Sequence, residues 1–245
     1  MFRRGGNMGN PQVGHNVIIE DNVTFGNNVT IGHNVIIYAN TVIGNNVMIQ
    51  DNAVIGKQPT RAKASILPKT KELPAAKIGS EVTIGTSTII YANSELADNV
   101  FVADLATVRE RVKIGEYTIV GRGVAIENDC TVGQRCKLET NCYITAYSKL
   151  EDYVFIAPCV VTTNDNYMAR SKERFSKFKG VTIKKGGRIG ANSTILPGKT
   201  IEEDGTVAAA SVVSKNVEKE SLVLGAPARK LKDVPEEQLL RNQER

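Results

Sequence analysis

The sequence predicts an all-β protein that folds as a parallel β-helix of about ten coils. The first observation is a six-residue repeat, in which an aliphatic residue returns at every sixth position through the blocks 13–60, 78–167 and 183–224. These blocks hold thirty hexads, and all but the two that begin at Thr162 and Lys219 begin with an apolar residue. The second observation is that Gly, Asn and Asp recur between the apolar positions. A repeat this regular indicates a solenoid, in which each coil packs on its neighbours.

The spacing explains how one coil closes. Side chains of a strand alternate between its two faces, so positions 1 and 5 of a hexad both point inward only if a turn separates the hexads. Position 1 is usually Ile, Val or Leu, and position 5 is usually Val, Ala, Ser, Thr or Cys. Gly, Asn and Asp tolerate the left-handed backbone of a tight corner. Three hexads then make one triangular coil, and equivalent residues stack 18 positions apart.

Two segments interrupt the repeat. The first, 61–77, reads RAKASILPKTKELPAAK, and the second, 168–182, reads MARSKERFSKFKGVT. We expect both to be loops extruded from corners, because a solenoid accommodates insertions there and such loops often form a binding face. The positive charge of the chain is densest around the second loop, which indicates either a solvated surface or a site for an anionic ligand. The basic residues concerned are Arg170, Lys172, Arg174, Lys177 and Lys179.

The chain ends in a segment without the repeat. We therefore divide it into a β-helix over 1–230 and a C-terminal tail over 231–245. From Pro235 the tail reads as a short amphipathic helix, with Glu236 and Glu237 in its first turn. We expect this helix to cover the open end of the β-helix, where an exposed strand edge would otherwise pair with another chain.

Composition limits the class of protein. The chain has 245 residues, a formal net charge of +5 and no Trp, so its core is aliphatic. It has no apolar run of the ~20 residues that cross a membrane, and its first twelve residues do not resemble a secretory signal. We expect a soluble cytoplasmic protein with no membrane partner. No nucleic-acid-binding motif accompanies the basic charge, so we expect no nucleic acid partner either.

The four cysteines do not form a metal or redox motif. Cys130, Cys136 and Cys142 are six residues apart and fall on the inward small position of the hexad, so we expect them to be buried free thiols. The fourth cysteine is Cys159, outside this spacing of six. The two histidines, His15 and His33, are 18 apart and replace Asn of the corner sequence. We interpret them as turn residues and predict no metal site, since a zinc site of three histidines lacks its third ligand.

The scarcity of histidine favours an amine as acceptor if the chain is an acyltransferase. A hydroxyl acceptor needs a general base, usually histidine, whereas a neutral amine attacks a thioester readily. Asn164 and Asp165 stand where the repeat meets the second loop. A carboxylate there could orient an ammonium group and accept a proton, although Asn-Asp is also an ordinary turn sequence.

The hexads resemble those of the hexapeptide-repeat acyltransferases. That resemblance implies a left-handed β-helix and a homotrimer with active sites between neighbouring subunits. Residues 163–170, TNDNYMAR, look like the Thr-Asn-Asp-x-Tyr-x-x-Arg signature of N-acetyltransferases that act on nucleotide-linked 3-amino sugars. VADLATVRE at 102–110 and KLETNCYIT at 137–145 also look like that group, especially the enzymes for dTDP-3-amino-3,6-dideoxyhexoses. The likeness runs from about residue 50 to the C-terminal segment.

Carried over residue by residue, the resemblance implies roles for six side chains. Asn164, Asp165 and Glu139 would bind the amino sugar and serve catalysis. Arg109 would bind the nucleotide diphosphate, or else form a salt bridge with Glu110 or Asp104. Tyr167 and Arg170 would reach the sugar nucleotide across the subunit boundary.

The resemblance also implies acetyl-CoA as co-substrate, bound between C-terminal coils mostly by backbone groups. The matching stretches are 186–198, 207–213 and 225–230. The candidate residues for acetyl-CoA are Arg188, Ala191, Ala209, Pro227, Arg229 and Lys230.

The predicted function is therefore transfer of an acetyl group from acetyl-CoA to the 3-amino group of a dTDP-linked deoxyamino sugar, in the synthesis of lipopolysaccharide or S-layer glycans. Three alternatives remain. The chain could acylate another amine, such as a UDP-linked amino sugar or tetrahydrodipicolinate. It could be an O-acetyltransferase, which the absence of a loop histidine disfavours, or a non-catalytic β-helix scaffold.

Overall fold

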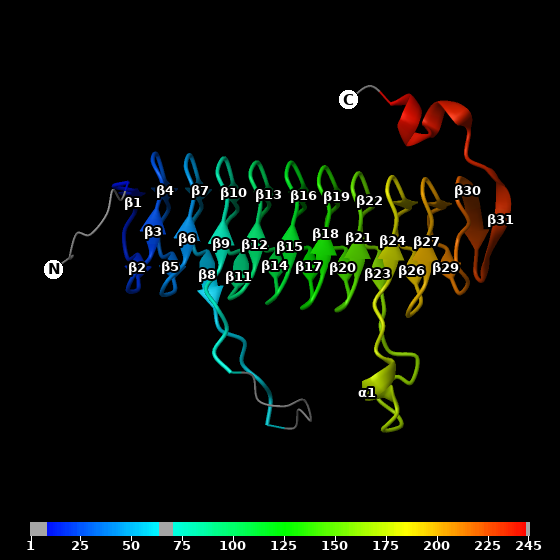
Figure 1. The fold of residues 1–245 in the computed structure, drawn as a ribbon, viewed down its shortest axis with the longest axis horizontal. Coiled ribbons are helices and arrows are strands. Elements are labelled where there is room, and N and C mark those ends of the chain that lie inside the picture. Colours follow the sequence, from blue (N-terminus) through cyan, green and yellow to red (C-terminus); the bar gives the residue numbers. More distant parts are fainter. Residues whose placement is uncertain (1–8, 64–70, 244–245) are drawn as a thin grey trace.

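The structure, a computed structural model, describes residues 9–63 and 71–243. Short parallel strands stack into three sheets that form the sides of a triangular prism (Figure 1). The chain rises through the sheet that faces the viewer in Figure 1, turns over the top edge and descends behind it while it advances to the right. This is a left-handed coil, so the predicted fold class is confirmed.

The sheets are named here by their order along the first coil. Sheet A contains β1 (Gln12–Val13), β4 (Thr30–Ile31), β7 (Met48–Ile49), β10 (Thr83–Ile84), β13 (Phe101–Val102), β16 (Ile119–Val120), β19 (Lys137–Leu138), β22 (Phe155–Ile156), β25 (Arg188–Ile189), β28 (Thr206–Val207), β30 (Ser221–Gly225) and β31 (Ala228–Asp233).

Sheet B contains β2 (Ile18–Ile19), β5 (Ile36–Ile37), β8 (Val54–Lys57), β11 (Ile89–Tyr91), β14 (Thr107–Val108), β17 (Ala125–Ile126), β20 (Tyr143–Ile144), β23 (Val161–Thr162), β26 (Thr194–Ile195) and β29 (Val212–Val213). Sheet C contains β3 (Thr24–Phe25), β6 (Val42–Ile43), β9 (Lys77–Ile78), β12 (Glu95–Leu96), β15 (Lys113–Ile114), β18 (Thr131–Val132), β21 (Lys149–Leu150), β24 (Thr182–Ile183) and β27 (Thr200–Ile201). The helices are α1 (Arg174–Lys177) and the 3-10 turns η1 (Glu236–Gln238) and η2 (Leu240–Asn242).

The register confirms the 18-residue coil. Within uninterrupted coils each strand pairs with the strand 18 residues later, as Ile84 does with Val102 and Val108 with Ile126. The second residue of each two-residue pair points inward, and these residues form one continuous buried stack. The largest fully buried side chains are Ile31, Ile37, Ile49, Ile55, Ile84, Ile90, Ile126, Leu138, Ile144, Leu150, Ile156 and Ile183.

The corners use the left-handed backbone that the sequence predicts. Asn16, Asn34 and Asn52 have φ near +57 to +60° and form a ladder, in which each side-chain amide donates to the next Asn Oδ1. Residues less suited to this conformation also adopt it, notably Leu105 at +61° and Tyr117 at +56°. The repeat therefore fixes the backbone of the corner even where the local residue does not favour it.

The cysteine prediction is confirmed. Cys130, Cys136 and Cys142 are buried free thiols in the core, whereas Cys159 is exposed at a corner. Burial raises the pKa of Cys130 and Cys142 to about 12 and that of Cys136 to about 11. All three behave as small apolar core residues.

The last coil departs from the predicted register. The chain shortens there, so that Val217 rather than Lys219 faces Ile201 of sheet C and is buried. Val223 then pairs with Val207 in sheet A. Sheet A thus gains an eleventh parallel strand, and the described chain makes about eleven turns instead of ten.

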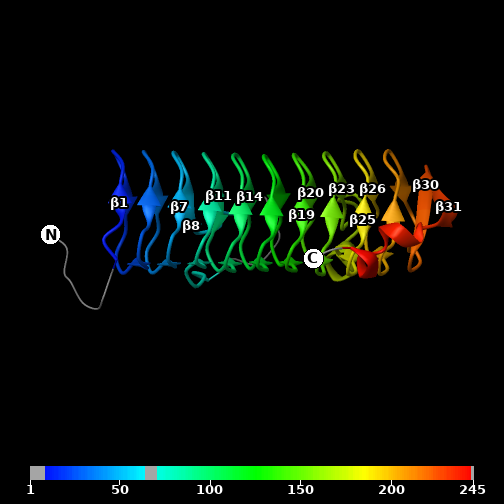
Figure 2. The ribbon, with the colours of Figure 1, turned by 90° about the horizontal axis from the view of Figure 1, so that it is seen from above.

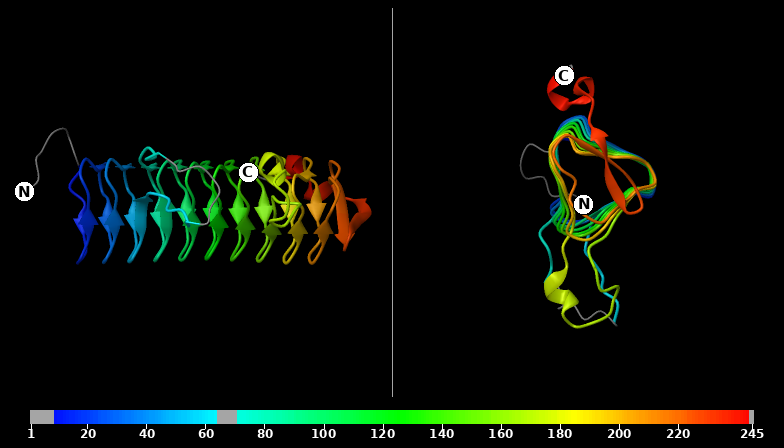
Figure 3. Two further views of the ribbon diagram at one scale, coloured as in Figure 1. Left: turned by 90° about the horizontal axis from the view of Figure 1, so that it is seen from below. Right: turned by 90° about the vertical axis from the view of Figure 1, so that its right-hand side faces the viewer.

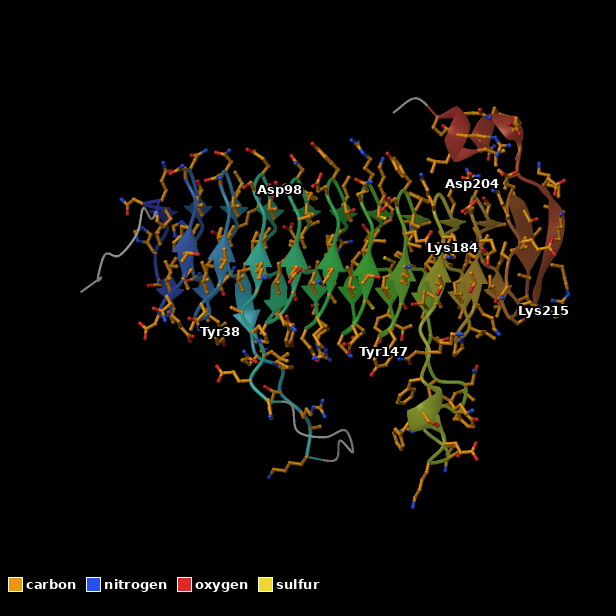
Figure 4. The ribbon with its side chains drawn as sticks, viewed as in Figure 1. Tyr38, Asp98, Tyr147, Lys184, Asp204 and Lys215 are labelled. Atoms are coloured by element: carbon orange, nitrogen blue, oxygen red, sulfur yellow. The ribbon has the colours of Figure 1, made fainter. Side chains whose placement is uncertain are left out.

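The C-terminal tail is built differently from our expectation. No α-helix forms from Pro235 within the described residues; the tail instead makes η1 and η2. Neither covers the open end. The edge of β30 is covered by β31, which pairs with it in antiparallel fashion, so the predicted boundary at 230 falls inside a strand. The two 3-10 turns lie beside the edge between sheets C and A, where Leu240 N donates to Asp204 Oδ1 (Figure 4).

Candidate functional site

Both interruptions leave the prism at the same corner, the one that connects sheet B to sheet C (Figure 3, right). We call it the B–C corner. The first loop joins β8 to β9 over 58–76, and the second joins β23 to β24 over 163–181. Both begin earlier than predicted, since the repeat continues in the sequence for a few residues after the chain has left the sheet. Asn164, Asp165 and Tyr167 therefore all belong to the second loop. In Figure 4, Tyr38 and Tyr147 mark the corner from which the loops project.

Backbone hydrogen bonds close the neck of the second loop. Asn164 O accepts from Lys179 N at 3.1 Å, and Lys179 O accepts from Gly198 N of the next coil at 3.0 Å. Gly198 has a φ of +70°, and a Cβ there would lie 3.0 Å from the Lys179 side chain. The loop is thus anchored to the coil beneath it, and Asn164 stands at its entrance.

Asp165 organises the interior of the second loop. Its Oδ1 accepts from Tyr167 N at 2.8 Å, and its Oδ2 accepts from Ala169 N at 3.0 Å and from Arg174 Nη1 at 3.1 Å. The Asp165 side chain is 18% exposed. The hydrogen bonds from Ala169, Tyr167 and Arg174 hold the pKa of its carboxyl below the usual value. The group is therefore an ionised carboxylate at neutral pH.

Arg174, the first residue of α1, was noted in the sequence only as part of the basic segment, and its pairing with Asp165 was not predicted. Its guanidinium lies 4.7 Å from the Phe175 ring centroid and 5.7 Å from that of Phe178, and the two rings meet edge to face. The sequence shows a basic segment with two Phe residues. That segment has no periodic pattern to indicate which of its Lys or Arg side chains contacts Asp165.

Tyr167 and Arg170 follow Asp165 in the second loop. Arg170 N donates to Tyr167 O at 2.9 Å, which makes a turn. Tyr167 is half-buried and Arg170 is exposed, as is Met168 between them, at 83%. The structure thus places the TNDNYMAR segment in one loop, with Asn164 and Asp165 at the neck and Arg170 toward solvent.

Arg109 lies on the B–C corner between the two loops. Its Nε donates to Glu110 Oε2 at 2.9 Å, its Nη1 lies 3.5 Å from Glu127 Oε2, and its guanidinium stacks over the Tyr91 ring at 4.7 Å. The salt bridge with Glu110, not one with Asp104, is the arrangement present. Two carboxylates already neutralise Arg109, so it would bind a diphosphate only by exchanging one of them.

Glu139 lies on a different corner from Asp165. It follows β19 and precedes β20, so it belongs to the corner between sheets A and B, which we call the A–B corner. The whole width of sheet B separates it from the second loop. The structure therefore does not bring Glu139 and Asp165 together within one chain.

Three of the residues predicted to bind acetyl-CoA gather on the A–B corner. Ala191 and Ala209 stack there, with Ala210 N donating to Ala191 O at 2.8 Å. Pro227 lies in the turn between β30 and β31, which returns at the same corner. At some other coils the equivalent backbone N–H donates to a side chain 18 residues on, as Thr86 N does to Asp104 and His33 N does to Asp51. Ala209 offers Ala191 no such acceptor.

The charged members of that predicted set lie elsewhere. Arg188 is on the outer side of sheet A, where Nη1 donates to Gln238 Oε1 at 3.4 Å while Nε and Nη2 are buried without a partner. Arg229 Nη1 donates to Ala228 O, and Lys230 Nζ pairs with Asp233 Oδ1 at 2.8 Å. Their positions do not define one phosphate site.

The two histidines are turn residues, as predicted. Their rings stack at 5.2 Å, His33 Nδ1 accepts from His15 N, and His33 N donates to Asp51 Oδ1. The described part of the chain holds no group of three side chains that could bind a metal ion. Among the same residues no helix is long and apolar enough to span a membrane.

Comparison with known proteins identifies the repeat. Residues 22–57 match the model of the bacterial transferase hexapeptide repeat, in its six-repeat form. The chain is also 29% identical over 136 residues to the bifunctional protein GlmU of Trichodesmium erythraeum (strain IMS101). That match covers 56% of this chain but only 27% of the relative, so the chain spans about a quarter of it.

Several solved structures are similar to parts of the chain. A maltose O-acetyltransferase from Clostridium difficile 630 is 24% identical, with a TM-score of 0.45, over 50% of this chain and 70% of its own. A hexapeptide-repeat-containing acetyltransferase from Vibrio cholerae is 26% identical, with a TM-score of 0.46, over 50% and 74%. A mutant GDP-perosamine N-acetyltransferase from Caulobacter crescentus, solved with CoA and GDP-perosamine, is 21% identical, with a TM-score of 0.42, over 60% and 57%.

Proposed function

We propose that this chain is an N-acyltransferase, which moves an acetyl group from acetyl-CoA to the 3-amino group of a dTDP-linked deoxyamino sugar. The observation that carries the proposal is Asp165. It is an ionised carboxylate, fixed by three hydrogen bonds at the neck of the loop whose sequence resembles the signature of that group. The match of residues 22–57 to the transferase hexapeptide repeat supports the reaction class.

Asp165 has room for one further partner. A carboxylate oxygen accepts about two hydrogen bonds. Oδ2 already has two, from Ala169 N and Arg174, whereas Oδ1 has one, from Tyr167 N. An acceptor ammonium that approaches Oδ1 would meet a full negative charge held in a fixed direction. Asn164, next to it at the neck, would orient a hydroxyl or carbonyl of the same ligand.

The low pKa of Asp165 suits it to binding and orienting the amine better than to removing its proton. In the reaction the neutral amine attacks the thioester carbonyl, a C–N bond forms and the C–S bond breaks. The amine proton passes to the departing thiolate, directly or through water. Much of the rate would then come from holding the amine and the thioester together.

The A–B corner fits the co-substrate. The backbone N–H groups of Ala191 and Ala209 have no side-chain acceptor, whereas on the same corner Thr86 N and His33 N are capped by Asp104 and Asp51. Such N–H groups suit the amide and carbonyl groups of the CoA arm. When bound, acetyl-CoA would supply the activated acyl group. Glu139 lies on this corner as well, so a neighbouring copy in a homotrimer would be needed to bring it near Asp165.

The positions of the histidines favour an amine acceptor over a hydroxyl. His15 and His33 lie on the first two coils, in contact with each other and Asp51, at the far end of the prism from the second loop (Figure 1). Each is held as a corner residue, so neither serves as the general base that a hydroxyl acceptor requires.

The test is thiol release from acetyl-CoA in the presence of dTDP- and UDP-linked 3-amino and 4-amino sugars. The proposal expects release with the dTDP-linked 3-amino sugar. Release with only a UDP-linked sugar would overturn the choice of nucleotide. No release from the whole panel, with no binding of acetyl-CoA, would overturn the enzyme class and favour a scaffold.

A further inference from the structure

The two loops at the B–C corner hold the positive charge of the chain. Counted along the sequence, residues 58–76 carry four basic side chains and one acidic one, and residues 163–181 carry five basic and two acidic ones. The net charge of the two loops is therefore +6, against +5 for the whole chain, and the rest of the chain is close to neutral at −1. The net charge of the protein thus belongs to two projections and not to the prism.

The cations of the prism and those of the loops differ in their partners. On the prism, Lys113 pairs with Glu95 at 3.3 Å and Lys184 pairs with Glu151 at 3.1 Å. Within the described part of the two loops, four lysines are exposed and form no ion pair. They are Lys63, Lys71, Lys172 and Lys177, and we call them the loop lysines. Because no carboxylate of the described chain neutralises them, they attract an anionic partner.

The exits of the two loops are too far apart to serve one small anion. The loops leave from β8 and β23, which are separated in sheet B by β11, β14, β17 and β20. The coils follow one another at an even spacing (Figure 2), so the exits lie about 24 Å apart at ~4.8 Å per strand. Exposed charges are largely screened beyond the Debye length, which is about 10 Å at 0.1 M salt. A partner that neutralises both loops must therefore be negatively charged over a wide surface.

Both loops project to the same side of the prism (Figure 1; Figure 3, right). The C-terminal turns η1 and η2 lie on the opposite side, so they do not cover the loops. A partner that contacts both loops at once therefore lies alongside the long axis of the prism. A flat anionic surface meets this requirement at any spacing of the loops, whereas a compact acidic protein would need its charges placed at two matching positions.

An exposed apolar side chain stands among the cations of the second loop. Met168 is 83% exposed, the highest value among the large hydrophobic side chains of the described residues. Its φ is +45° and that of Ala169 is +65°, a conformation that residues other than glycine rarely adopt. Hydrogen bonds from Tyr167 N and Ala169 N to Asp165 hold this turn. The loop thus keeps Met168 in water at a conformational cost, which indicates a contact that the single chain does not contain.

We propose that the two loops dock the protein on an anionic lipid surface, with the prism lying along that surface. The loop lysines contact the headgroup phosphates, and Met168 enters the boundary between headgroups and acyl chains. Sequence composition led us to expect no membrane partner because the chain has no apolar run that could span a bilayer. Binding at the surface needs no such run. The proposal goes beyond the proposed function and does not depend on the acyl acceptor.

The test is sedimentation of the full-length protein with lipid vesicles in about 0.1 M salt. Vesicles of phosphatidylcholine with about one third phosphatidylglycerol are expected to carry the protein into the pellet. Vesicles of phosphatidylcholine alone are expected to leave it in solution. Raising the salt to about 0.5 M should release the protein from the anionic vesicles, because the charges of the loops are then screened.

Two double variants test each loop separately. Lys172→Glu/Lys177→Glu reverses two charges of the second loop, and Lys63→Glu/Lys71→Glu reverses two of the first. Each basic residue close to an anionic surface contributes about fivefold to binding, so each variant should bind the anionic vesicles at least ~20-fold more weakly. Circular dichroism checks that the variants are folded.

The matched control makes the same change in net charge elsewhere. Lys137→Glu/Lys232→Glu alters two exposed lysines of sheet A, the side of the prism opposite the B–C corner. Since these positions lie away from the proposed contact, this variant should bind close to the wild type. Equal loss in the control would mean that net charge, and not the loops, sets the binding.

A second measurement reports whether the apolar side chain enters the lipid. The chain has no Trp, so Met168→Trp introduces a single indole. Its fluorescence should move to shorter wavelength when the anionic vesicles are added, because indole prefers the less polar boundary of the bilayer. Leu231→Trp is the matched control on β31, where the native side chain is 57% exposed. Its spectrum should not change.

Absence of wild-type binding to the anionic vesicles would overturn the proposal. Loop variants that bind as well as the wild type would do the same, as would a Met168→Trp spectrum that the vesicles leave unchanged. Retention of the protein on immobilised polyglutamate without vesicle binding would assign the loops to an acidic protein instead. Should a loop variant fail to fold, the salt dependence of the wild type and the Met168→Trp spectrum decide.

Discussion

Arg174 and Asp165, nine residues apart in the sequence, form an ion pair at 3.1 Å that closes the second loop on its own neck. The guanidinium packs over Phe175 and lies within 5.7 Å of the Phe178 ring centroid. The carboxylate in turn holds the backbone of Tyr167 and Ala169. The Arg174–Asp165 ion pair thus links the rings of Phe175 and Phe178 to the segment that carries the proposed site.

Arg174→Ala is expected to release the loop without unfolding the prism. The substitution removes the charge-assisted bond and the packing against both rings, and the β-helix core does not depend on either. Amide hydrogen exchange in 166–178 should become at least about 10-fold faster, while peptides from β14 and β17 exchange as in the wild type. Lys172→Ala, exposed on the same loop, is the control. Unchanged exchange in Arg174→Ala would contradict this account of the loop.

The order of the loop should depend on pH in a defined direction. The pKa of Asp165 is lowered in the folded chain, so its stabilising effect is complete above the unfolded value of about 3.9 and is lost as pH falls through the folded value. Exchange protection in 166–178, corrected for the intrinsic rate, should be equal at pH 7 and pH 5 and fall at pH 3. Asp165→Asn should show no such fall, and a variant that kept it would assign the effect to another group.

Leu105→Asn should stabilise the protein. Leu105 is 57% exposed and has a φ of +61°, a conformation that costs a branched residue about 1 kcal/mol and that Asn tolerates. The melting temperature should rise by about 1–4 °C. Leu105→Ala removes the same exposed side chain but keeps the unfavourable backbone, so it should gain less. Equal shifts in both variants would mean that exposure, and not the corner backbone, sets the effect.

One of the four thiols should react in the native protein. Cys159 is exposed, whereas Cys130, Cys136 and Cys142 are buried and their thiol pKa values are raised to about 11–12. Titration with a chromogenic disulfide should release about one equivalent quickly, and all four after denaturation. Fast reaction of a second thiol would show that the coil around β19 opens readily.

The repeat made most of the fold predictable. Position 1 of the hexad identified the inward stack from Ile31 to Ile189, because the period links each of these residues directly to its place in a coil. The shortened last coil was missed because Lys219 stands at the first position of a hexad in the sequence, whereas in the structure Val217 takes the inward position. The strand Ala228–Asp233 was missed because an antiparallel return carries no hexad signal.

The site was less predictable. Asp165 could be placed at a loop entrance because the repeat stops there. The pairing of Arg174 with Asp165 could not be predicted, since it is a tertiary contact within an irregular segment. The corner of Glu139 could have been found by counting, because 24 residues separate Leu138 from Thr162, which is one coil and one further hexad. That count puts Glu139 one corner away from the second loop.

The most direct measurement is the initial rate of thiol release from acetyl-CoA by the wild type and by Asp165→Asn, with the dTDP-linked 3-amino sugar as acceptor. The account predicts that Asp165→Asn lowers kcat/KM at least ~10-fold, equivalent to ~1.4 kcal/mol in the barrier. Lys172→Ala, with an intact neck, should match the wild type. An Asp165→Asn enzyme as fast as the wild type would remove Asp165 from the reaction and contradict the proposed site.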